Sequence, residues 1–326
     1  MVFRVVALAL LHHATADLAP PSEVAQNNFL EGSPFEDWKR AFGVSYATAA
    51  EDARRARVFS ANLARFEAMG GRFVADRSAA TTRAEFKARR GGCAAAATAA
   101  SPAPPGVATL RLPPNTTIDY RALGQVTGVK DQGAYGTCWS FGFSGTLEGL
   151  GVRQGAALVE VSEQEMIDCC DACQGSSQDA DYAFVLGSLG GRLATEATYA
   201  YEGARGACRN ASAGVALAPA VVSGNGRAND DAAQTGAPML EALVAHGPSA
   251  VGIDSSCLQG YAAGVIVGCN STGIDHEVLI VGAGVDGGVP YWLVKNSWGA
   301  QWGEDGYFRC GRAGGQLGIG SIVYAF

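Results

Sequence analysis

Charged side chains, histidines and long apolar runs are all scarce in this sequence. Charged residues make up 17% of the chain, the net charge is −7, and no basic patch stands out, which argues against nucleic-acid binding. No stretch approaches the roughly 20 apolar residues that a membrane span needs. Apolar residues nevertheless make up 48% of the composition. We therefore expect one or two folded globular units, with no nucleic-acid and no membrane partner.

The first 16 residues have the pattern of a signal peptide. Arg4 gives them a positive start, Val5–Leu11 forms an apolar core, and Ala14 and Ala16 frame a small-residue cleavage site. This core is much shorter than a membrane span. The sequence therefore predicts a soluble product of the secretory pathway, with residues 1–16 removed. A buried N-terminal strand is the alternative.

Nine cysteines occur in a chain expected in an oxidising compartment, so most of them are expected to form disulfides. Because nine is odd, at least one thiol lacks an intramolecular partner. Three N-x-S/T sequons also suit this compartment. The candidate glycosylation sites are Asn115, Asn210 and Asn270.

The sequence changes character after its first third. The segment Gly91–Pro114 consists of small residues followed by prolines, which predicts an exposed, protease-sensitive linker. Asp17–Arg111 carries 13 basic and 10 acidic side chains, whereas Leu112–Phe326 carries 10 basic and 21 acidic ones. These counts give net charges of +3 and −11, so the two parts differ in sign.

Periodicity predicts helices in the first part of the chain and strands in the last. Apolar residues at helical spacing favour helix over 35–69, and residues 76–90 suggest a strand or loop that leads into a short helix. Further helices are expected to begin at Cys138 and after Ser162, which opens a capping-box pattern. Beyond about Gly247 the segments are typical of strands.

A cysteine at the start of a helix suggests nucleophilic chemistry. Cys138 follows the sequence DQGAYGT, and the unpaired N–H groups of a helix N-terminus favour a thiolate. Two of the four histidines leave with the signal peptide, and His246 is interpreted as structural. His276 opens an apolar strand within Asp-His-Glu and is the candidate base. Asn296 can orient an imidazole by accepting its second N–H.

The ordered motifs resemble those of the papain-like cysteine proteases, and among them the cathepsin L type. They are, in order, VKDQG, GTCWSF, VSEQEMIDC, YAYEG, GIDHEVLIVG and VKNSWGAQWGEDGYFR, and they cover nearly all of Leu112–Phe326. The resemblance implies an α+β fold with a helical and a β-barrel-like subdomain, and an endopeptidase without cofactor or metal. It also implies a monomer that cleaves peptide substrates in a lysosome, a vacuole or the extracellular space.

The N-terminal part is similar to the inhibitory propeptide of the same family. The residues at the spacing of its helix are Glu51, Arg55, Phe59 and Asn62, and of the element that follows only Asp76 fits. The resemblance implies an inactive precursor inhibited by its own propeptide, and a mature enzyme that cystatin-like proteins inhibit. It divides the chain into signal peptide, propeptide, linker and peptidase domain, at 1–16, 17–90, 91–111 and 112–326.

Carried over position by position, the resemblance assigns roles to five residues. Cys138 is the nucleophile, His276 is the acid and base, and Asn296 orients His276. Trp298 shields that pair from water. Gln132 forms the oxyanion hole together with the backbone N–H of Cys138.

Tyr135 stands where the family has a cysteine that is bridged to the counterpart of Cys173. We expect Tyr135 to replace this bridge by packing. The disulfides that the resemblance implies are Cys169–Cys208 and Cys257–Cys269. The remaining pairings stay open, including a bridge between 170 and 173, for the set Cys93, Cys170, Cys173 and Cys310.

The resemblance also implies a set of substrate-binding residues, Gly175, Ser176, Gly252, Asp275, Glu277, Trp298 and Ile322. Ser176 replaces a glycine, so substrate binding is expected to be altered. Gly252 and Ile322 make the pocket for P2, the second residue before the scissile bond, roomy and apolar. Glu277 takes a place usually held by alanine or glycine. It either lines this pocket and favours a basic P2 residue, or it faces solvent.

Two alternatives concern the whole chain. Gly282–Gly287 fits the dinucleotide-binding pattern G-x-G-x-x-G, but a strand-like sequence follows where that motif needs a helix, so a hairpin is expected. The other alternative is a catalytically weak or non-catalytic binding relative on the same fold. The retained Cys138 argues against it.

Overall fold

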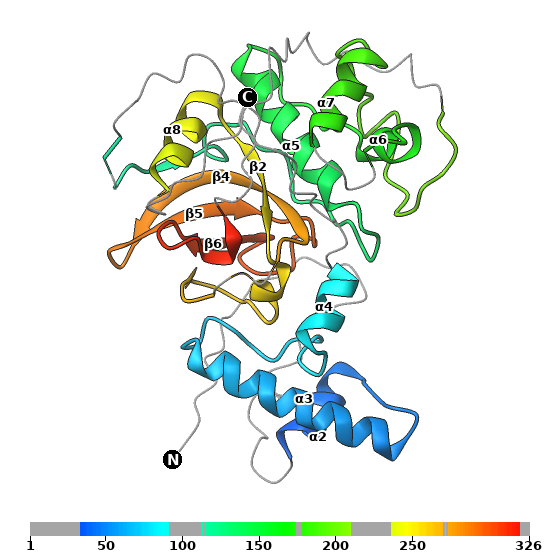
Figure 1. Cartoon of the computed structure of the whole chain (residues 1–326), viewed down its shortest axis with the longest axis vertical. Helices are drawn as coiled ribbons and strands as arrows, with labels where there is room; N and C mark the ends of the chain where they lie inside the picture. Colours follow the sequence, from blue (N-terminus) through cyan, green and yellow to red (C-terminus); the bar gives the residue numbers. More distant parts are fainter. Residues whose placement is uncertain are drawn as a thin grey trace. The chain divides into compact units, whose positions relative to one another are not determined.

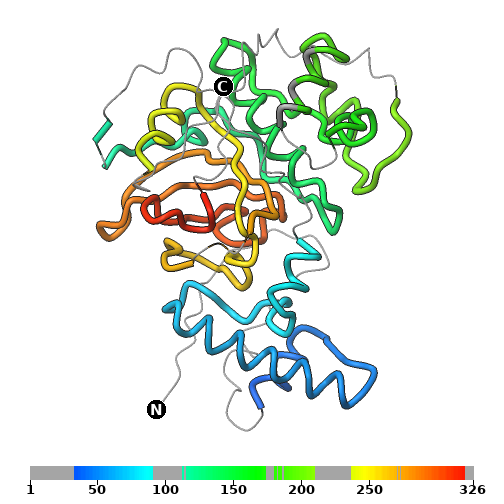
Figure 2. Tube along the Cα trace, viewed as in Figure 1, coloured from blue at the N-terminus to red at the C-terminus, as the bar shows by residue number. Residues whose placement is uncertain are grey.

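The chain divides into two compact units. The first holds Met1–Glu85 together with Gln259–Ala262, and the second holds Phe86–Leu258 and Ala263–Phe326. The structure is a computed structural model, and Figure 2 traces its chain. It describes residues 33–90, 112–113, 115–173, 178–209, 236–269, 271 and 273–319.

Several predicted features lie outside these described residues. They are the signal peptide, the linker, and the sequons at Asn210 and Asn270. Within the described ranges, no helix has the length and apolar character that crossing a membrane requires.

Two helices joined by a short turn make up much of the first unit, α2 (Pro34–Phe42) and α3 (Ala49–Ala68). The prediction of helix over 35–69 is therefore confirmed for both helices and wrong for the turn between them. Gly43 adopts a left-handed conformation with φ 61°, which ends α2. The Thr48 hydroxyl then caps the first turn of α3.

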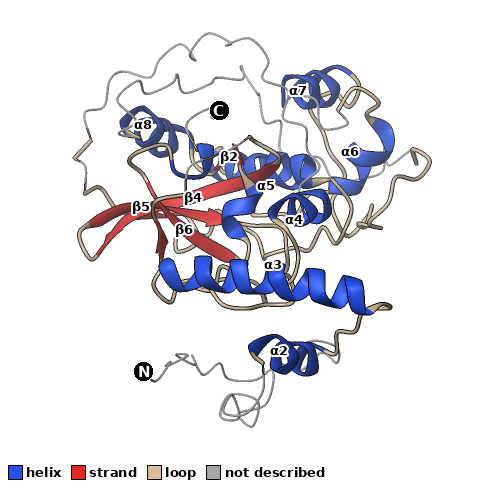
Figure 3. Ribbon diagram, turned by 60° about the horizontal axis from the view of Figure 1, so that its bottom comes forward, coloured by secondary structure: helices blue, strands red, loops and turns tan. Residues whose placement is uncertain are grey.

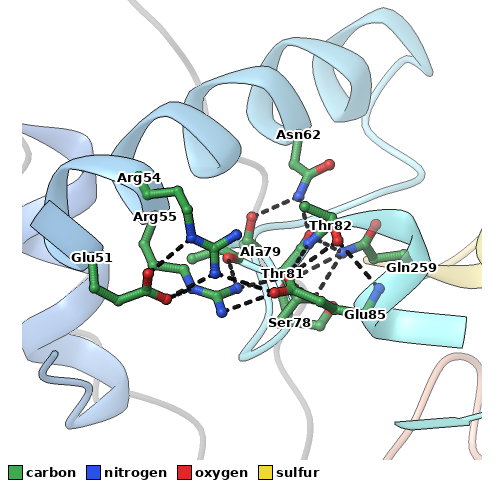
Figure 4. A network of polar contacts seen from close by, with 11 residues as sticks. Glu51, Arg54, Arg55, Asn62, Ser78, Ala79, Thr81, Thr82, Glu85 and Gln259 are labelled. Carbon is green, nitrogen blue, oxygen red and sulfur yellow. Dashed lines mark hydrogen bonds and ion pairs between the residues drawn. The ribbon is translucent and has the colours of Figure 1, made fainter. Parts of the chain in front are cut away.

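An ion-pair network links α3 to the start of α4 (Arg83–Arg90), as Figure 4 shows. Arg55 lies 2.7 Å from a carboxylate oxygen of Glu51 and 2.7 Å from one of Glu85. Arg54 contacts the same two carboxylates at 2.8 and 3.2 Å. Hydrogen bonds from Arg54 and Arg55 lower the pKa of Glu51 to about 2. At Glu85, partial burial acts against the same arginines, which still lower its pKa to about 2.

The segment Gln259–Ala262 comes from the far end of the sequence and belongs to the first unit because it hydrogen-bonds the stretch after α3. Gln259 Nε2 donates to the carbonyl of Thr81 at 2.9 Å. The backbone N–H of Val74 donates to the carbonyl of Gly260 at 2.7 Å. The first unit is therefore built from both sides of the predicted linker.

The second unit starts within α4 and contains further described helices. These are α5 (Cys138–Arg153), α6 (Glu163–Cys169), α7 (Gln178–Gly187), α8 (Ala237–His246), and the 3₁₀ helices η1 (Ser255–Leu258) and η2 (Gln316–Gly318). The predicted helix start at Cys138 is confirmed, and so is the cap, since the Ser162 hydroxyl accepts the N–H of Glu165 at 3.0 Å. The Glu165 carboxylate turns instead to the N–H of Ala194, at 2.6 Å.

The described strands form one sheet (Figure 1). They are β1 (Ile118–Asp119), β2 (Ser249–Ile253), β3 (Val265–Ile266), β4 (His276–Asp286), β5 (Val289–Lys295) and β6 (Tyr307–Gly311). Their order is β1-β4-β5-β6-β3, with β2 also paired to β4. The expected hairpin at Gly282–Gly287 is confirmed, because β4 and β5 pair up to Asp286 opposite Val289.

Glycines on one face of α5 let this helix lie directly against β4 and β2 (Figure 3). A Cβ atom on Gly145 would lie 2.7 Å from Leu279 of β4, and one on Gly149 would lie 2.9 Å from Pro248. Separate hydrophobic clusters fill the helical part and the sheet. The predicted α+β architecture with a helical and a strand-rich subdomain is confirmed, and over the described residues the sheet stays open rather than closing into a barrel.

Candidate active site

Cys138 is the first residue of α5, and its side chain is buried. The preceding residue, Thr137, makes no side-chain cap on the helix. Its hydroxyl lies instead 2.8 Å from the hydroxyl of Tyr201. This arrangement leaves the N-terminal end of α5 to stabilise a negative charge on the sulfur of Cys138.

Cys138 is disulfide-bonded in the structure. Three other disulfides join described cysteines, namely Cys169–Cys208, Cys170–Cys173 and Cys257–Cys269, and Cys310 is free. In this state Cys138 carries no thiolate.

His276 and Asn296 form a buried pair. The Oδ1 atom of Asn296 accepts a hydrogen bond from Nε2 of His276 at 2.8 Å and another from the N–H of Ser297 at 2.9 Å. Both bonds fix the amide and hold the proton of neutral His276 on Nε2. Among the described residues, Nδ1 of His276 has no hydrogen-bond partner. Nδ1 is therefore the nitrogen that is available to take a proton.

The Trp298 indole covers this pair. Its ring stacks on His276 with 4.8 Å between centroids and 22° between planes. Phe86 of α4 meets Trp298 edge-on at 5.7 Å, and the guanidinium of Arg90 lies 5.5 Å from the Trp298 centroid. Burial lowers the pKa of His276 to about 4; the hydrogen bond to Asn296 opposes this shift, and the positive charge of Arg90 adds to it.

Close packing between α5 and β4 brings Cys138 and His276 into one region. Gly142 lies one helical turn after Cys138, and Glu277 directly follows His276. A Cβ atom built on Gly142 would lie only 2.5 Å from Oε1 of Glu277. The start of α5 and the start of β4 are therefore adjacent, as a cysteine nucleophile and its base require.

Gln132 is held with its amide in a defined orientation. Its Oε1 accepts a hydrogen bond from the Ser297 hydroxyl at 2.6 Å, and its Nε2 donates to the carbonyl of Tyr135 at 3.0 Å. An amide NH₂ group has two protons, so one remains for an oxyanion. The loop before Cys138 thus carries a preoriented donor, which is what an oxyanion hole needs.

The sequence and the structure were compared with those of known proteins. The model of the papain family cysteine proteases matches residues 114–325. The chain belongs to the papain family of cysteine proteases. It is 41% identical over 219 residues to cysteine proteinase EP-B 1 of Hordeum vulgare, covering 64% of this chain and 57% of that protein. It is 35% identical over 294 residues to cysteine proteinase B of Leishmania mexicana, covering 84% and 64%.

Solved structures in precursor form are also similar. The Amb a 11 cysteine protease of ragweed pollen in its proform is 27% identical, with a TM-score of 0.74 and coverage of 89% of this chain and 90% of that one. Digestive procathepsin L 3 of Tenebrio molitor is 29% identical, with a TM-score of 0.68 and coverage of 90% and 99%. The chain spans less than two thirds of the length of the two curated relatives.

Two tyrosines contact the loop before Cys138 and its surroundings. Tyr135 packs against the cluster that contains Cys138, Cys170 and Cys173. The hydroxyl of Tyr201 holds the loop, since it donates to the carbonyl of Gln132 at 2.8 Å and also contacts Thr137. Sequence reasoning missed Tyr201, although its motif, YAYEG, was among those that carry the resemblance.

A buried charge cluster beneath the site was also missed. Lys130 lies 2.8 Å from Glu163 and 3.5 Å from Glu148. Burial acts to lower the pKa of Lys130, but the two carboxylates outweigh it and raise this pKa. Thr127 donates to Glu148 at 2.6 Å and accepts from Lys295 at 3.0 Å. The cluster therefore ties α5 and α6 to the end of β5, directly before Asn296.

Two of the proposed P2-pocket residues are cross-strand neighbours, since Gly252 pairs with Glu277 between β2 and β4. The Glu277 side chain extends toward Gly142 and lines a cavity together with Lys130 and Lys295. Asp275 lies at the same end of β4, where its N–H donates to Ile253 at 3.0 Å. The other substrate-binding candidates lie outside the described residues, namely Gly175, Ser176 and Ile322.

Proposed function

We propose that the chain is the zymogen of a cysteine endopeptidase that hydrolyses peptide bonds through Cys138, His276 and Asn296. One observation carries this proposal: the hydrogen bond from His276 to Asn296 leaves Nδ1 as the free basic nitrogen, at the start of a strand that packs against the helix begun by Cys138. Neither a cofactor nor a metal enters the chemistry.

The reaction follows from these groups. Nδ1 of His276 takes the proton of the Cys138 thiol, and the resulting thiolate attacks the peptide carbonyl carbon. The carbonyl electrons move to oxygen, where Gln132 and the Cys138 N–H stabilise them. As the tetrahedral species collapses, the carbon–nitrogen bond breaks and His276 protonates the leaving amine. His276 then takes a proton from water, which attacks the thioester. The carbon–sulfur bond breaks, and the acid product leaves.

The propeptide suppresses this chemistry in two ways. Residues Phe86 and Arg90 cover Trp298, and the buried His276 beneath it stays neutral near pH 7 because its pKa is about 4. Burial and the positive charge of Arg90 therefore disfavour the imidazolium form of His276 in the covered site. The disulfide at Cys138 removes the nucleophile as well.

The maturation route follows from the sequence. We propose that the signal peptide directs the chain into the secretory pathway, toward a lysosome, a vacuole or the extracellular space. Acid then promotes cleavage within Gly91–Pro114, which leaves a mature N-terminus near Leu112, and a thiol reductant opens the disulfide at Cys138 to give the active enzyme. The partners of the product are peptide substrates, its own propeptide and cystatin-like inhibitors, and it acts as a monomer.

Peptide hydrolysis by the acid-processed chain, measured with a thiol reductant present, tests the proposal. Cys138→Ala and His276→Ala should each lower kcat by several orders of magnitude, on the order of 10⁶ in a serine-protease precedent. Asn296→Ala should be milder, because Asn296 orients the imidazole and does not react. His246→Gln is the matched histidine control, since His246 ends α8 and belongs to no part of the site. Hydrolysis retained in Cys138→Ala would refute the proposed mechanism, and a wild-type chain without hydrolysis would favour the binding relative.

A further inference from the structure

The ammonium group of Lys87, in α4, lies in a site made of three oxygen ligands. Its Nζ atom donates to the carbonyl of Gly273 at 2.8 Å. It also lies 3.1 Å from Oδ1 of Asp254 and 3.5 Å from Oδ1 of Asp275. Two carboxylates and a carbonyl around one primary ammonium form a receptor for a cation.

The carboxylates are positioned by the peptidase part of the chain and not by Lys87. Both are held by the serines that begin η1. Ser255 donates to Asp275 through its N–H at 2.8 Å and through its hydroxyl at 2.7 Å. Ser256 donates to Asp254 through its N–H at 3.0 Å and its hydroxyl at 2.6 Å. The geometry is therefore set before a cation arrives.

Burial makes a cation in this site important. The Asp254 side chain is fully buried, and that of Asp275 is 17% exposed. Burial raises the pKa of Asp275, Asp254 raises it further, and the Ser255 hydrogen bonds and the positive charge of Lys87 oppose these effects. When α4 leaves with the propeptide, the two adjacent carboxylates lose the positive charge of Lys87, and another cationic side chain can enter the place of its ammonium group.

The site lies on a defined side of the scissile bond. Asp275 directly precedes His276, the residue that protonates the leaving amine in the proposed mechanism. A side chain that reaches Asp275 and Asp254 therefore belongs to the leaving-group half of a bound peptide.

We propose that Asp254, Asp275 and the Gly273 carbonyl form a specificity subsite for a lysine or arginine side chain on the leaving-group side of the substrate, and that Lys87 occupies this subsite in the zymogen. This inference rests on the proposed protease function and extends it to substrate choice. The ammonium group of Lys87 then occupies the place of the cationic substrate side chain, and the subsite becomes accessible when α4 leaves.

Matched peptides test the inference in the acid-processed wild-type chain with a thiol reductant present. Each pair differs in one residue, lysine against norleucine, which has a similar aliphatic stem without the charge. The pairs cover each of the first three positions after the scissile bond and, as a control, the three before it. At one leaving-group position, lysine should raise kcat/KM by about 10- to 150-fold, as expected for a charge-assisted pair.

Variants assign the preference to the site. Asp254→Asn should bring the lysine-to-norleucine ratio at that position to within about threefold of unity, by loss of one of the two carboxylates. Asp286→Asn is the matched control, since Asp286 is a half-exposed carboxylate that pairs with Arg309, and its ratio should equal that of wild type. The ratio is measured within each variant, so a change in total activity does not affect it.

Two outcomes overturn the inference. One is hydrolysis by the wild-type chain with a ratio near unity at all leaving-group positions, which leaves Lys87 as an anchor of the propeptide alone. The other is a lysine preference that Asp254→Asn and Asp275→Asn both retain. A chain that hydrolyses no peptide refutes the proposed function instead, and the relative affinities of the same peptides for that chain then decide the subsite.

Discussion

Gly260→Ala should make the segment Gln259–Ala262 open more often from the first unit, whereas Gly268→Ala should leave this opening unchanged. Both glycines adopt nearly the same left-handed conformation, with φ 77° and 78°, so alanine costs about 1–2 kcal/mol of backbone strain at either position. A Cβ atom on Gly260 would also lie 2.6 Å from the ring of Phe66 and 2.8 Å from the carbonyl of Val74. On Gly268, the new atom would have no described atom within 4 Å.

The difference between the two variants contains the packing at Gly260, and any backbone strain at Gly260 that opening of the segment relieves adds to it. Overpacking of this kind costs about 1–3 kcal/mol, which corresponds to a change of about 5- to 150-fold in an equilibrium constant. Two backbone hydrogen bonds hold the segment in place, from Val74 to Gly260 at 2.7 Å and from Ala262 to Arg72 at 2.9 Å. Exchange of these two amide protons reports how often the segment opens.

Hydrogen exchange on the full-length chain at neutral pH makes the comparison. The amides of Val74 and Ala262 should exchange about 5- to 150-fold faster in Gly260→Ala than in Gly268→Ala. Amides at the centre of β5 serve as the internal reference and should be unchanged. Equal exchange in the two glycine variants would refute the packing of Phe66 against Gly260.

Three further predictions concern acid, the nucleophile loop and the P2 pocket. Glu51 and Glu85 have a folded pKa of about 2 against an ordinary 4.5, so their contribution to stability is present above pH 4.5 and is lost as the pH falls from there toward 2. Tryptophan fluorescence should show the first unit unfolding in that window, and unchanged stability there would contradict the ion-pair network. Tyr201→Phe should cost about 1–3 kcal/mol in urea unfolding and lower kcat more than it changes KM, because the hydroxyl holds the loop at Gln132; identical unfolding curves and kcat would exclude this role. Glu277→Ala should remove any preference for arginine or lysine at P2 in a peptide library, and coinciding profiles would show that Glu277 does not line that pocket.

Much of the fold could be predicted from the sequence because local sequence patterns favour the same conformations that tertiary packing requires. The helix start at Cys138, the Ser162 cap and the hairpin before Val289 each follow from a short sequence pattern, and the structure contains all three. The order of motifs was enough to indicate the family. The motif residues determine both the local backbone conformation and the proposed chemistry, so the same short patterns predict the fold and the site.

Other features depend on contacts between residues far apart in the chain. Nothing near Gln259 predicts that it joins the N-terminal unit, because its partner Thr81 lies 178 residues away. The cation site likewise joins Lys87 to Asp254 and Asp275, which no local pattern connects. Periodicity could not identify these partners, since they meet only after the sheet and helices have packed.

The disulfides show the limit of counting cysteines. The resemblance named Cys169–Cys208 and Cys257–Cys269, and both bonds occur in the structure. The pairing of Cys170 with Cys173 had stayed open, since a separation of three residues permits a bridge without requiring one. The resemblance implies that Tyr135 stands in place of the usual partner of Cys173, and in the structure Cys173 bonds to Cys170.

Covalent labelling of Cys138 by an epoxide thiol inhibitor tests the central claim most directly. We predict one equivalent of label on Cys138 in the acid-processed chain, located by mass spectrometry, and only after a thiol reductant has opened the disulfide. His276→Ala should label far more slowly, because the thiolate loses its base. Rapid labelling of His276→Ala, label on the buried Cys310, or no label after reduction and processing would contradict a Cys138–His276 nucleophile.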